Sequence, residues 1–175
     1  MKKLINIEPH IRIIKDFPKA GINFYDIGSL LAHPEAWQSA MDQAIEVIAP
    51  YKPDIIVGIE ARGFLMAPPI AERMGLPIAM IRKQGKIPGE VLSYAYDLEY
   101  GSDCIELQSG VIPKGARVAV VDDLLATGGT MGAAETLISQ AGADVALHFC
   151  LIELNGLNGR DKLSAPFEAL LTKPA

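Results

Sequence analysis

The chain has 175 residues, of which 50% are hydrophobic and 21% are charged. That length and composition suit a single folded domain with a sizeable core, and they exclude a disordered chain. The formal net charge of -5 argues against a nucleic-acid-binding surface, so no nucleic-acid partner is expected.

The sequence contains no pattern typical of secretion or membrane insertion. The basic residues Lys2 and Lys3 are not followed by an apolar run, and no stretch approaches the ~20 apolar residues of a membrane span. Cys104 and Cys150 fit no C-x-x-C spacing and are expected to be free thiols in a reducing compartment. These observations predict a cytoplasmic protein that does not bind a membrane.

The N-terminal part of the chain has short, irregular patterns before its first clear helix. Residues 4–15 mix apolar and charged side chains and are expected to form a short helix. Residues 22–27 alternate like a short strand or an extended arm. Pro34 suits the first turn of a helix and Glu35 suits its positive end, so a helix is predicted from Pro34 to about residue 49.

Further along, apolar strand-like runs alternate with helical segments. A helix is predicted between a loop at residues 60–63 and Gly75, and Pro68 and Pro69 must either kink this helix or mark its true start. Repeated strand-then-helix units predict an α/β fold, a twisted and mainly parallel sheet flanked by helices on both faces. The strands of this sheet are predicted at residues 54–59, 77–81, 118–121 and 145–152.

Residues 82–108 interrupt the alternation. They begin with basic residues, pass through Pro88 and Gly89, and contain two extended runs that join near residue 100. Excursions of this length are often lids. The segment is therefore interpreted as a hairpin, which either closes over an active site or lies on the surface without a role.

The strand at residues 118–121 leads to two adjacent carboxylates, Asp122 and Asp123, and then to a turn of small residues. The helix after this turn is predicted to end at Gly142. A strand, a small-residue turn and a helix N-terminus direct several backbone N–H groups at one point, which is how a chain binds phosphate. Carboxylates beside that point suit the hydroxyls of a sugar or a magnesium ion. The stretch predicts a sugar-phosphate site, and the alternative is an exposed strand end followed by an ordinary helix cap.

Cations are expected near such a site, because a sugar phosphate with a pyrophosphate leaving group carries several negative charges. Arg62 lies in the turn after one predicted strand, where its guanidinium can donate two hydrogen bonds to a pyrophosphate. Three more cations follow the next strand. The alternative is that each is a solvated surface residue, the usual location of lysine and arginine. The candidate pyrophosphate ligands are Arg62, Arg82, Lys83 and Lys86.

Residues 120–130, Val-Val-Asp-Asp-Leu-Leu-Ala-Thr-Gly-Gly-Thr, resemble the phosphoribosyl pyrophosphate motif of the type I phosphoribosyltransferases. Residues 60–65, 81–89 and 96–101 are each similar to segments of the adenine phosphoribosyltransferases within that family. The similarity extends from about residue 11 to about residue 163. Together these segments are more specific than the phosphate motif, which regulators and other transferases share.

The resemblance implies an organisation and a reaction. The organisation is one phosphoribosyltransferase domain over residues 1–175, with an N-terminal hood or arm at residues 1–30 and a flexible catalytic hairpin at residues 82–108. The reaction is purine salvage, in which adenine and 5-phosphoribosyl 1-pyrophosphate (PRPP) give AMP and pyrophosphate. The resemblance also implies a homodimer and a magnesium ion that arrives with the substrate and has no direct protein ligand.

The same resemblance assigns roles to the residues that match the family's motifs. Glu99, on the hairpin, matches the catalytic glutamate. Phe24 is placed to stack on adenine and Leu154 to pack on its other face, although residues of these types are more often part of a core. Backbone groups near Asn23 and Arg62 would read the edge of the base. The residues for the 5-phosphate and ribose are Asp122, Asp123, Ala126, Thr127, Gly128, Gly129 and Thr130, and those for the pyrophosphate are Arg62, Arg82, Lys83 and Lys86.

One position departs from the family pattern, because members commonly have Phe-Arg-Asp where this chain has Phe24, Tyr25 and Asp26. The change is expected to remove a contact to the ligand or across a dimer interface.

Other functions stay open: transfer to hypoxanthine, guanine or xanthine, or a non-catalytic regulator that senses PRPP. A regulator would need a nucleic-acid-binding element, and the sequence has no helix-turn-helix pattern. A plain α/β domain without a ligand would leave the motifs as coincidences.

Overall fold

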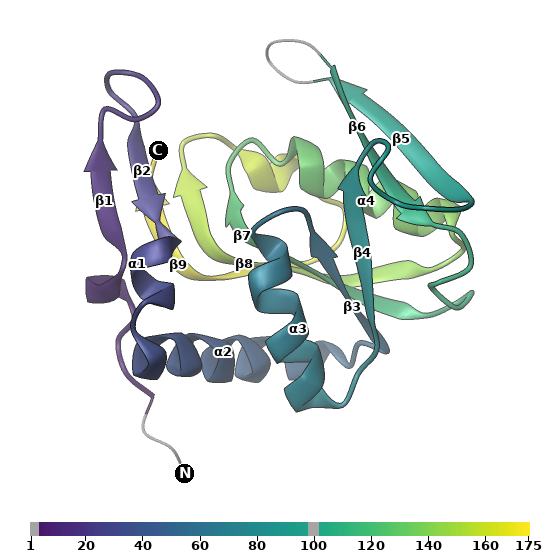
Figure 1. Cartoon of the computed structure of the whole chain (residues 1–175), viewed down its shortest axis with the longest axis horizontal. Helices are drawn as coiled ribbons and strands as arrows, with labels where there is room; N and C mark the ends of the chain where they lie inside the picture. The colour runs from purple at the N-terminus through teal and green to yellow at the C-terminus, as the bar shows by residue number, and fades with distance from the viewer. Residues whose placement is uncertain (1–3, 98–101) are drawn as a thin grey trace.

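The computed structural model describes residues 4–97 and 102–175, which form a central seven-stranded sheet with helices on both faces (Figure 1). Within those residues the strand order is β5-β6-β4-β3-β7-β8-β9, and a separate two-stranded sheet pairs β1 with β2. From β4 to β9 in this order neighbouring strands are parallel, whereas β6 and β5 are antiparallel additions at one edge. The predicted α/β fold class is confirmed.

The described elements have the following bounds. The strands are β1 (Arg12–Lys15), β2 (Asn23–Asp26), β3 (Ile55–Ile59), β4 (Ile78–Lys83), β5 (Val91–Asp97), β6 (Ser102–Gln108), β7 (Arg117–Leu125), β8 (Asp144–Asn155) and β9 (Phe167–Pro174). The helices are α1 (Ile27–Leu31), α2 (Pro34–Ile48), α3 (Gly63–Met74) and α4 (Gly129–Gln140), with 3-10 turns η1 (Glu8–His10), η2 (Ala49–Tyr51) and η3 (Gly159–Lys162).

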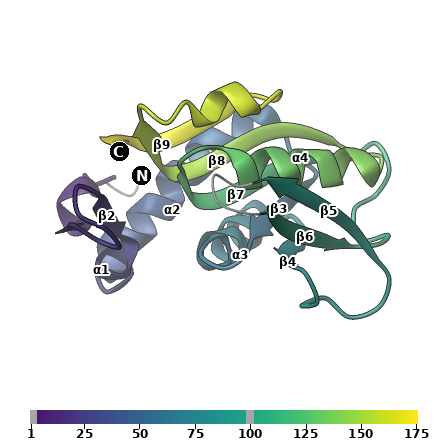
Figure 2. The same ribbon diagram turned by 90° about the horizontal axis from the view of Figure 1, so that it is seen from above.

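The helices enclose a hydrophobic core on each face of the sheet, and Figure 2 shows α3 and α4 on opposite faces. Successive side chains of a strand point to opposite faces. In β7, Ala119 and Val121 therefore belong to the core under α2 and α3, whereas Val118 and Val120 belong to the core under α4. A strand segment covered on both faces must be apolar, as predicted for residues 118–121. None of the described helices is long and apolar enough to cross a membrane.

The helix expected at residues 4–15 is wrong. This segment contains only the short turn η1, and residues 12–15 pair as β1 with β2 in an antiparallel sheet. Ile13 and Ile14 are β-branched and favour an extended backbone. Pairing with β2 satisfies the backbone of the segment without a helix.

Several element boundaries also differ from the predictions, since β4 continues to Lys83 and β8 to Asn155. Helix α3 begins at Gly63, so Pro68 and Pro69 lie inside it and do not mark its start. Packing of its apolar face against the sheet holds the helix despite the donors that the prolines lack. Strand β7 continues past the acid pair to Leu125, because residues 124 and 125 pair with β8.

The small β1–β2 sheet stands beside the end of β9, near the C-terminus (Figure 1). Tyr25 is buried, and its hydroxyl donates a hydrogen bond to the Pro174 carbonyl oxygen at 2.8 Å. The N-terminal hood is therefore attached to the last strand of the main sheet. The departure from the family pattern at Tyr25 thus contributes packing between the two ends of the chain.

Candidate active site

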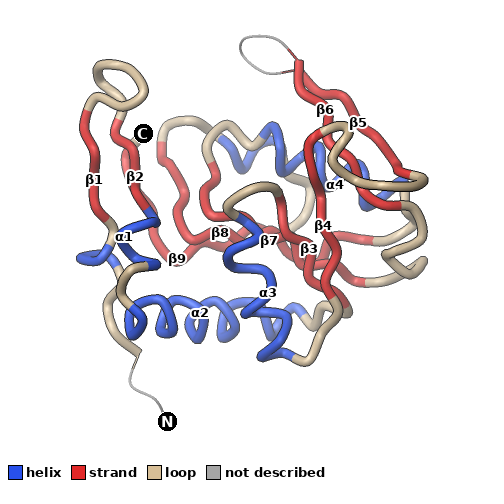
Figure 3. The backbone as a smooth tube through the Cα atoms, in the orientation of Figure 1, coloured by secondary structure: helices blue, strands red, loops and turns tan. Residues whose placement is uncertain are grey.

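The predicted site residues that the structure describes come together at the edge where the parallel strands end. The turns after β3, β4, β7 and β8 lie at this edge, between the β1–β2 sheet and the β5–β6 hairpin (Figures 1 and 3). Ligands of open α/β sheets bind outside the carboxyl ends of the strands. This edge is therefore the candidate active site.

The turn between β7 and α4 forms the candidate phosphate site. Gly128 is the N-cap of α4 and has φ of 76°, a left-handed conformation that suits glycine. The first backbone N–H groups of a helix have no partner within the helix, and the helix dipole is positive there. A hollow of about 100 Å³ at this turn suits an anion of phosphate size. It is lined by Asp122, Leu124, Leu125, Ala126, Thr127, Gly128, Gly129, Thr130 and Met131.

The β5–β6 hairpin contacts the start of α4. The Tyr96 hydroxyl on β5 lies 3.0 Å from Thr130 Oγ1, within hydrogen-bond distance. Tyr96 is a contact that sequence reasoning missed, although it begins one of the segments that resemble the family. Glu99, the predicted catalytic residue, lies outside the described residues, so its role stays a prediction.

Asp122 and Asp123 lie beside the turn and are largely shielded from water. Asp123 is only 3% exposed and Asp122 is partly buried. Asp122 Oδ1 accepts a hydrogen bond from the Asp123 backbone N–H at 2.8 Å. Burial raises the pKa of Asp122 well above its usual range, and the charge of Asp123 raises it further. Burial also raises the pKa of Asp123, although the nearby Arg62 guanidinium opposes this.

Arg62 connects the acid pair with the N-terminal hood. Its Nε lies 3.0 Å from Asp123 Oδ2, and its guanidinium carbon lies 5.6 Å from the centre of the Phe24 ring. The adjacent Gly63 is packed against β7, since a Cβ at this position would lie 2.6 Å from the Val121 carbonyl oxygen. The close backbone contact fixes the turn that carries Arg62, and the turn places this cation beside both the predicted ribose site and the predicted base site.

The other three predicted cations lie at the end of β4 or just after it, since Arg82 and Lys83 are the last two residues of this strand. Arg82 donates hydrogen bonds to both carboxylate oxygens of Glu60, through Nε at 3.3 Å and Nη2 at 3.0 Å, and these bonds lower the pKa of Glu60. Lys83 donates its backbone N–H to Glu60 at 3.0 Å, and its Nζ lies 3.2 Å from Asp103 Oδ2. The Lys86 side chain is exposed, and its carbonyl oxygen accepts from Arg82 at 3.0 Å. Arg82 and Lys83 thus already pair with protein carboxylates.

The residues predicted to bind the base come from opposite ends of the chain. Phe24 lies on β2, where its ring meets Phe17 edge to face at 5.3 Å between centroids. Asn23 is partly buried on the same strand. Leu154 lies at the carboxyl end of β8 and packs against the core under α2 and α3. The structure places Phe24 next to Arg62 and packs Leu154 against the core, so the roles of Phe24 and Leu154 in base binding stay predictions.

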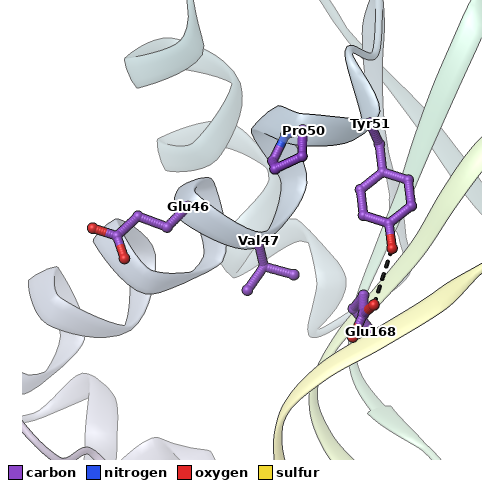
Figure 4. A pocket seen from close by; sticks show the side chains of 5 residues that line it. All are labelled: Glu46, Val47, Pro50, Tyr51 and Glu168. Atoms are coloured by element: carbon purple, nitrogen blue, oxygen red, sulfur yellow. Dashed lines mark hydrogen bonds between the residues drawn. The ribbon is translucent and has the colours of Figure 1, made fainter.

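A separate hollow of about 410 Å³ lies away from this edge, where the end of α2 and η2 meet β9 (Figure 4). Tyr51 donates a hydrogen bond to Glu168 Oε1 there at 2.9 Å, and this bond raises the pKa of the Tyr51 hydroxyl. The hollow is lined by Glu46, Val47, Pro50, Tyr51 and Glu168. A lining with two carboxylates and no cation does not suit a polyanion, and it includes no predicted site residue.

The chain matches the family model of the phosphoribosyl transferase domain over residues 26–165. The adenine phosphoribosyltransferase of Rhodospirillum centenum is 53% identical over 168 residues, which cover 96% of this chain and 98% of that protein. The enzyme of the same name from Desulfitobacterium hafniense is 48% identical over 161 residues, which cover 92% of this chain and 93% of that protein.

Solved structures agree with these relatives. Adenine phosphoribosyltransferase from Thermoanaerobacter pseudethanolicus has a TM-score of 0.91 and 42% identity, and the match covers 95% of this chain and 97% of that one. The enzyme from Saccharomyces cerevisiae, complexed with an imino-altritol bisphosphate and adenine, has a TM-score of 0.89 and 38% identity, covering 94% and 96%. The chain therefore belongs to the phosphoribosyltransferase family and, within it, to the adenine phosphoribosyltransferases.

Proposed function

We propose that this chain transfers the 5-phosphoribosyl group of PRPP to N9 of adenine and so forms AMP and pyrophosphate. The observation that carries the proposal is a single edge of the sheet that combines a backbone turn for phosphate, a buried acid pair and several cations. Membership of the adenine phosphoribosyltransferases supports adenine as the base. We propose that residues 1–175 form one phosphoribosyltransferase domain, which is supported by two hydrophobic cores that share the same sheet.

The proposed contacts to PRPP follow from the charges at this edge. Backbone N–H groups of residues 126–130 hold the 5-phosphate, and the carboxylates of Asp122 and Asp123 accept hydrogen bonds from the ribose hydroxyls. The pyrophosphate takes the cations that now pair with protein carboxylates, so its oxygens replace those carboxylates. The paired cations are Arg62, Arg82 and Lys83, and the exposed side chain of Lys86 is proposed to join them at the pyrophosphate.

Adenine is proposed to bind between the hood and the end of β8. Phe24 stacks on one face of the purine and Leu154 packs on the other. Such walls hold any purine, so the choice of base depends on hydrogen bonds from the backbone near Asn23 and Arg62. The 5.6 Å distance between Arg62 and the Phe24 ring supports a base site here, because it places the stacking residue beside the ribose site.

The chemistry requires a bond exchange at C1 of the ribose. The C1–O bond to pyrophosphate breaks, the N9–C1 bond forms, and adenine loses the proton on N9. The ribose carries oxocarbenium character in the transition state, as in glycosyl transfer generally. Positioning of the reactants and stabilisation of the leaving pyrophosphate supply most of the rate. Glu99 is proposed to accept the proton that adenine loses from N9. Closure of the hairpin at residues 82–108 is proposed to exclude water that would hydrolyse PRPP.

Magnesium is proposed to bind together with the pyrophosphate. No group of three His, Cys, Asp or Glu side chains among the described residues could hold a metal ion. Asp123 Oδ2 is buried and pairs with Arg62 Nε at 3.0 Å, and Asp122 lies next to it. This pair fits an ion whose ligands come mainly from substrate oxygens and water, as magnesium prefers. Such an ion would neutralise charge on the leaving group.

A homodimer is supported by an exposed apolar area on the outer side of α3 and β4. Ile78, Met80 and Val111 are 42%, 50% and 37% exposed. They line a hollow of about 440 Å³ together with Phe64 and Pro68 of α3. Apolar areas of this kind mark protein interfaces. Sedimentation of the wild-type chain is expected to give a dimer, and Met80→Lys is expected to give monomers; a monomeric wild type contradicts the proposal.

We place the enzyme in the cytoplasm. Cys104 is partly buried and Cys150 is fully buried, and neither forms a disulfide. Free thiols are typical of a reducing compartment.

The decisive experiment is a panel of adenine, hypoxanthine, guanine and xanthine with PRPP and magnesium, in which released pyrophosphate is measured. Adenine alone is expected to give product. Release with another base identifies a different phosphoribosyltransferase, and binding of PRPP without release indicates a regulator. Glu99→Ala is expected to keep PRPP binding and to lose on the order of a hundredfold in turnover.

A further inference from the structure

The 3-10 turn η3 lies directly against the candidate phosphate turn. Gly159 is buried, and a Cβ on it would lie 2.3 Å from the Ala126 carbonyl oxygen. Conversely, a Cβ on Gly128 would lie 2.2 Å from the Gly159 carbonyl oxygen. The backbone of η3 at Gly159 therefore packs against the phosphate turn at Ala126 and at Gly128, the residues on either side of Thr127. Neither position has room for a side chain.

The contact continues along the first turn of α4. A Cβ on Gly132 would lie 3.0 Å from the Lys162 carbonyl oxygen, at the other end of η3. Beyond η3, the Ser164 backbone N–H donates to Glu135 Oε2 of α4 at 3.1 Å. Both ends of η3 thus pack against α4, the helix whose N-terminus points at the proposed phosphate, or against the turn before it.

Arg160 fixes η3 to the main sheet. Its Nε and Nη2 donate to Glu153 Oε1 and Oε2 at 2.5 and 2.7 Å, a two-point pairing that defines the orientation of both groups. Its Nη1 donates to the Phe167 carbonyl oxygen at 3.3 Å, and its guanidinium carbon lies 4.6 Å from the Phe167 ring centre. Glu153 is paired with Leu125 in the register of β7 and β8, immediately before the phosphate turn. Arg160 therefore connects η3 to the strand beside that turn.

We propose that η3 positions the phosphate turn, with Gly159 and Arg160 as positioning residues outside the phosphate motif. The inference rests on the proposed function, since it concerns how the site holds the 5-phosphate of PRPP and AMP. The proposed ligand contacts are backbone N–H groups, whose directions depend on the peptide planes at residues 126–128. A support of backbone atoms on the opposite side keeps those planes in place, and a displacement of about 1 Å is enough to lose much of the catalytic rate.

Two glycines in the same segment provide a matched test. Gly159 has no left-handed φ, so Gly159→Ala adds only a methyl group that must displace Ala126. Gly156 has φ of 90° and open space around it, so Gly156→Ala strains the backbone without touching the turn. Gly159→Ala is expected to raise the dissociation constant of AMP and the KM for PRPP by about tenfold or more. The KM for adenine is expected to stay within about twofold. Gly156→Ala is expected to lose stability and to keep all three constants.

A second variant decides the question if Gly159→Ala does not fold. Arg160→Lys keeps the charge but loses the two-point pairing with Glu153, and it is expected to raise the same two constants by a few-fold, whereas Arg160→Gln raises them further. Calorimetry with AMP separates failure of the proposed function from failure of the positioning role of η3. A wild type that does not bind AMP overturns the proposed function. A wild type that binds AMP, with Gly159→Ala and both Arg160 variants binding equally well, overturns the positioning role alone.

Discussion

The candidate site has a phosphate half, formed by residues 126–130 and η3, and a cation half, formed by Arg62, Arg82, Lys83 and Lys86. The two halves are built differently. In the phosphate half, backbone packs on backbone, as at Gly128 against Gly159. In the cation half, side chains form ion pairs, as between Arg82 and Glu60 at 3.0 Å and between Lys83 and Asp103 at 3.2 Å. The first kind of contact has one geometry, whereas the second can change partners.

This difference indicates how the two halves respond to a ligand. Close backbone contacts fix the phosphate turn before substrate arrives, so binding there requires little reorganisation. Ion pairs between partly exposed groups contribute little to stability and are screened by salt. The cations can therefore exchange carboxylates for phosphate oxygens at low cost. Damage to the phosphate half should affect every phosphorylated ligand, whereas damage to the cation half should affect only ligands that contain pyrophosphate.

The largest effect is expected for Gly128→Ala. The methyl group meets the Gly159 carbonyl oxygen, and φ of 76° disfavours any residue with a Cβ. We expect kcat/KM for PRPP to fall about a hundredfold or more, AMP binding to fall in parallel, and stability to fall by about 2 kcal/mol. Gly110→Ala is the control, because Gly110 has φ of 75° with open space around it. Calorimetry with AMP checks both, and normal AMP binding by Gly128→Ala contradicts a phosphate site in this turn.

Arg82→Ala tests the cation half. The KM for PRPP and the inhibition constant of pyrophosphate are expected to rise between about tenfold and a hundredfold, because an arginine that binds phosphate oxygens is lost. AMP has no pyrophosphate, so its dissociation constant should stay within about twofold. Arg73→Ala is a matched control, since Arg73 pairs with Asp42 and is 30% exposed, as Arg82 is. A parallel loss of AMP binding in Arg82→Ala would remove the distinction between the halves.

Asp122→Asn tests the acid pair, which joins the halves. Because burial raises the pKa of Asp122, the folded state holds this proton more tightly than the unfolded state. Stability contributed by Asp122 is therefore lost as pH rises from the ordinary carboxylate pKa through the raised value. The amide can still accept the Asp123 N–H through Oδ1 but carries no charge.

We accordingly expect Asp122→Asn to be more stable than the wild type by about 1 kcal/mol at about pH 8, with little difference at about pH 4. Its kcat/KM for PRPP should fall about tenfold, because a charged acceptor for the ribose hydroxyls is lost. Urea unfolding at both pH values measures the first effect. A variant that is less stable at about pH 8 would show that the carboxylate is well satisfied in the folded state.

The sequence predicts those parts of the molecule that are local in the chain. The phosphate turn is contiguous, so its strand, acid pair and glycines are visible together in residues 118–130. The apolar runs of the central strands are predicted for the same reason, although β7 continues past its apolar run to Leu125. Strand β9 was not predicted, because it follows the short turn η3 and no long helix separates it from β8. Residues 12–15 form a strand only because β2 is available to pair with them.

Contacts between distant residues could not be predicted in this way. The ion pair of Arg82 with Glu60 joins the end of β4 to the turn after β3, and the position of Phe24 beside Arg62 depends on how the hood folds over the sheet. In the sequence, Tyr25 is a departure from the family's pattern, whereas in the structure its hydroxyl donates a hydrogen bond to Pro174, 149 positions away. Packing of this kind has no periodic signal in the sequence.

Tyr96→Phe is expected to have the smallest effect, and it tests whether the hairpin belongs to the phosphate half. The Tyr96 hydroxyl lies 3.0 Å from Thr130 Oγ1, so the variant loses one hydrogen bond between the hairpin and the start of α4. Such a bond contributes about 1 kcal/mol, which corresponds to about a fivefold fall in kcat/KM for PRPP. Tyr94→Phe is the control, because Tyr94 lines the same hollow of about 270 Å³ beside Gly129 and is expected to retain wild-type rates. Steady-state kinetics at several PRPP concentrations separates the two variants. Equal rates for both would mean that the hairpin moves independently of the phosphate turn, and closure over the substrate would then depend on the cation half alone.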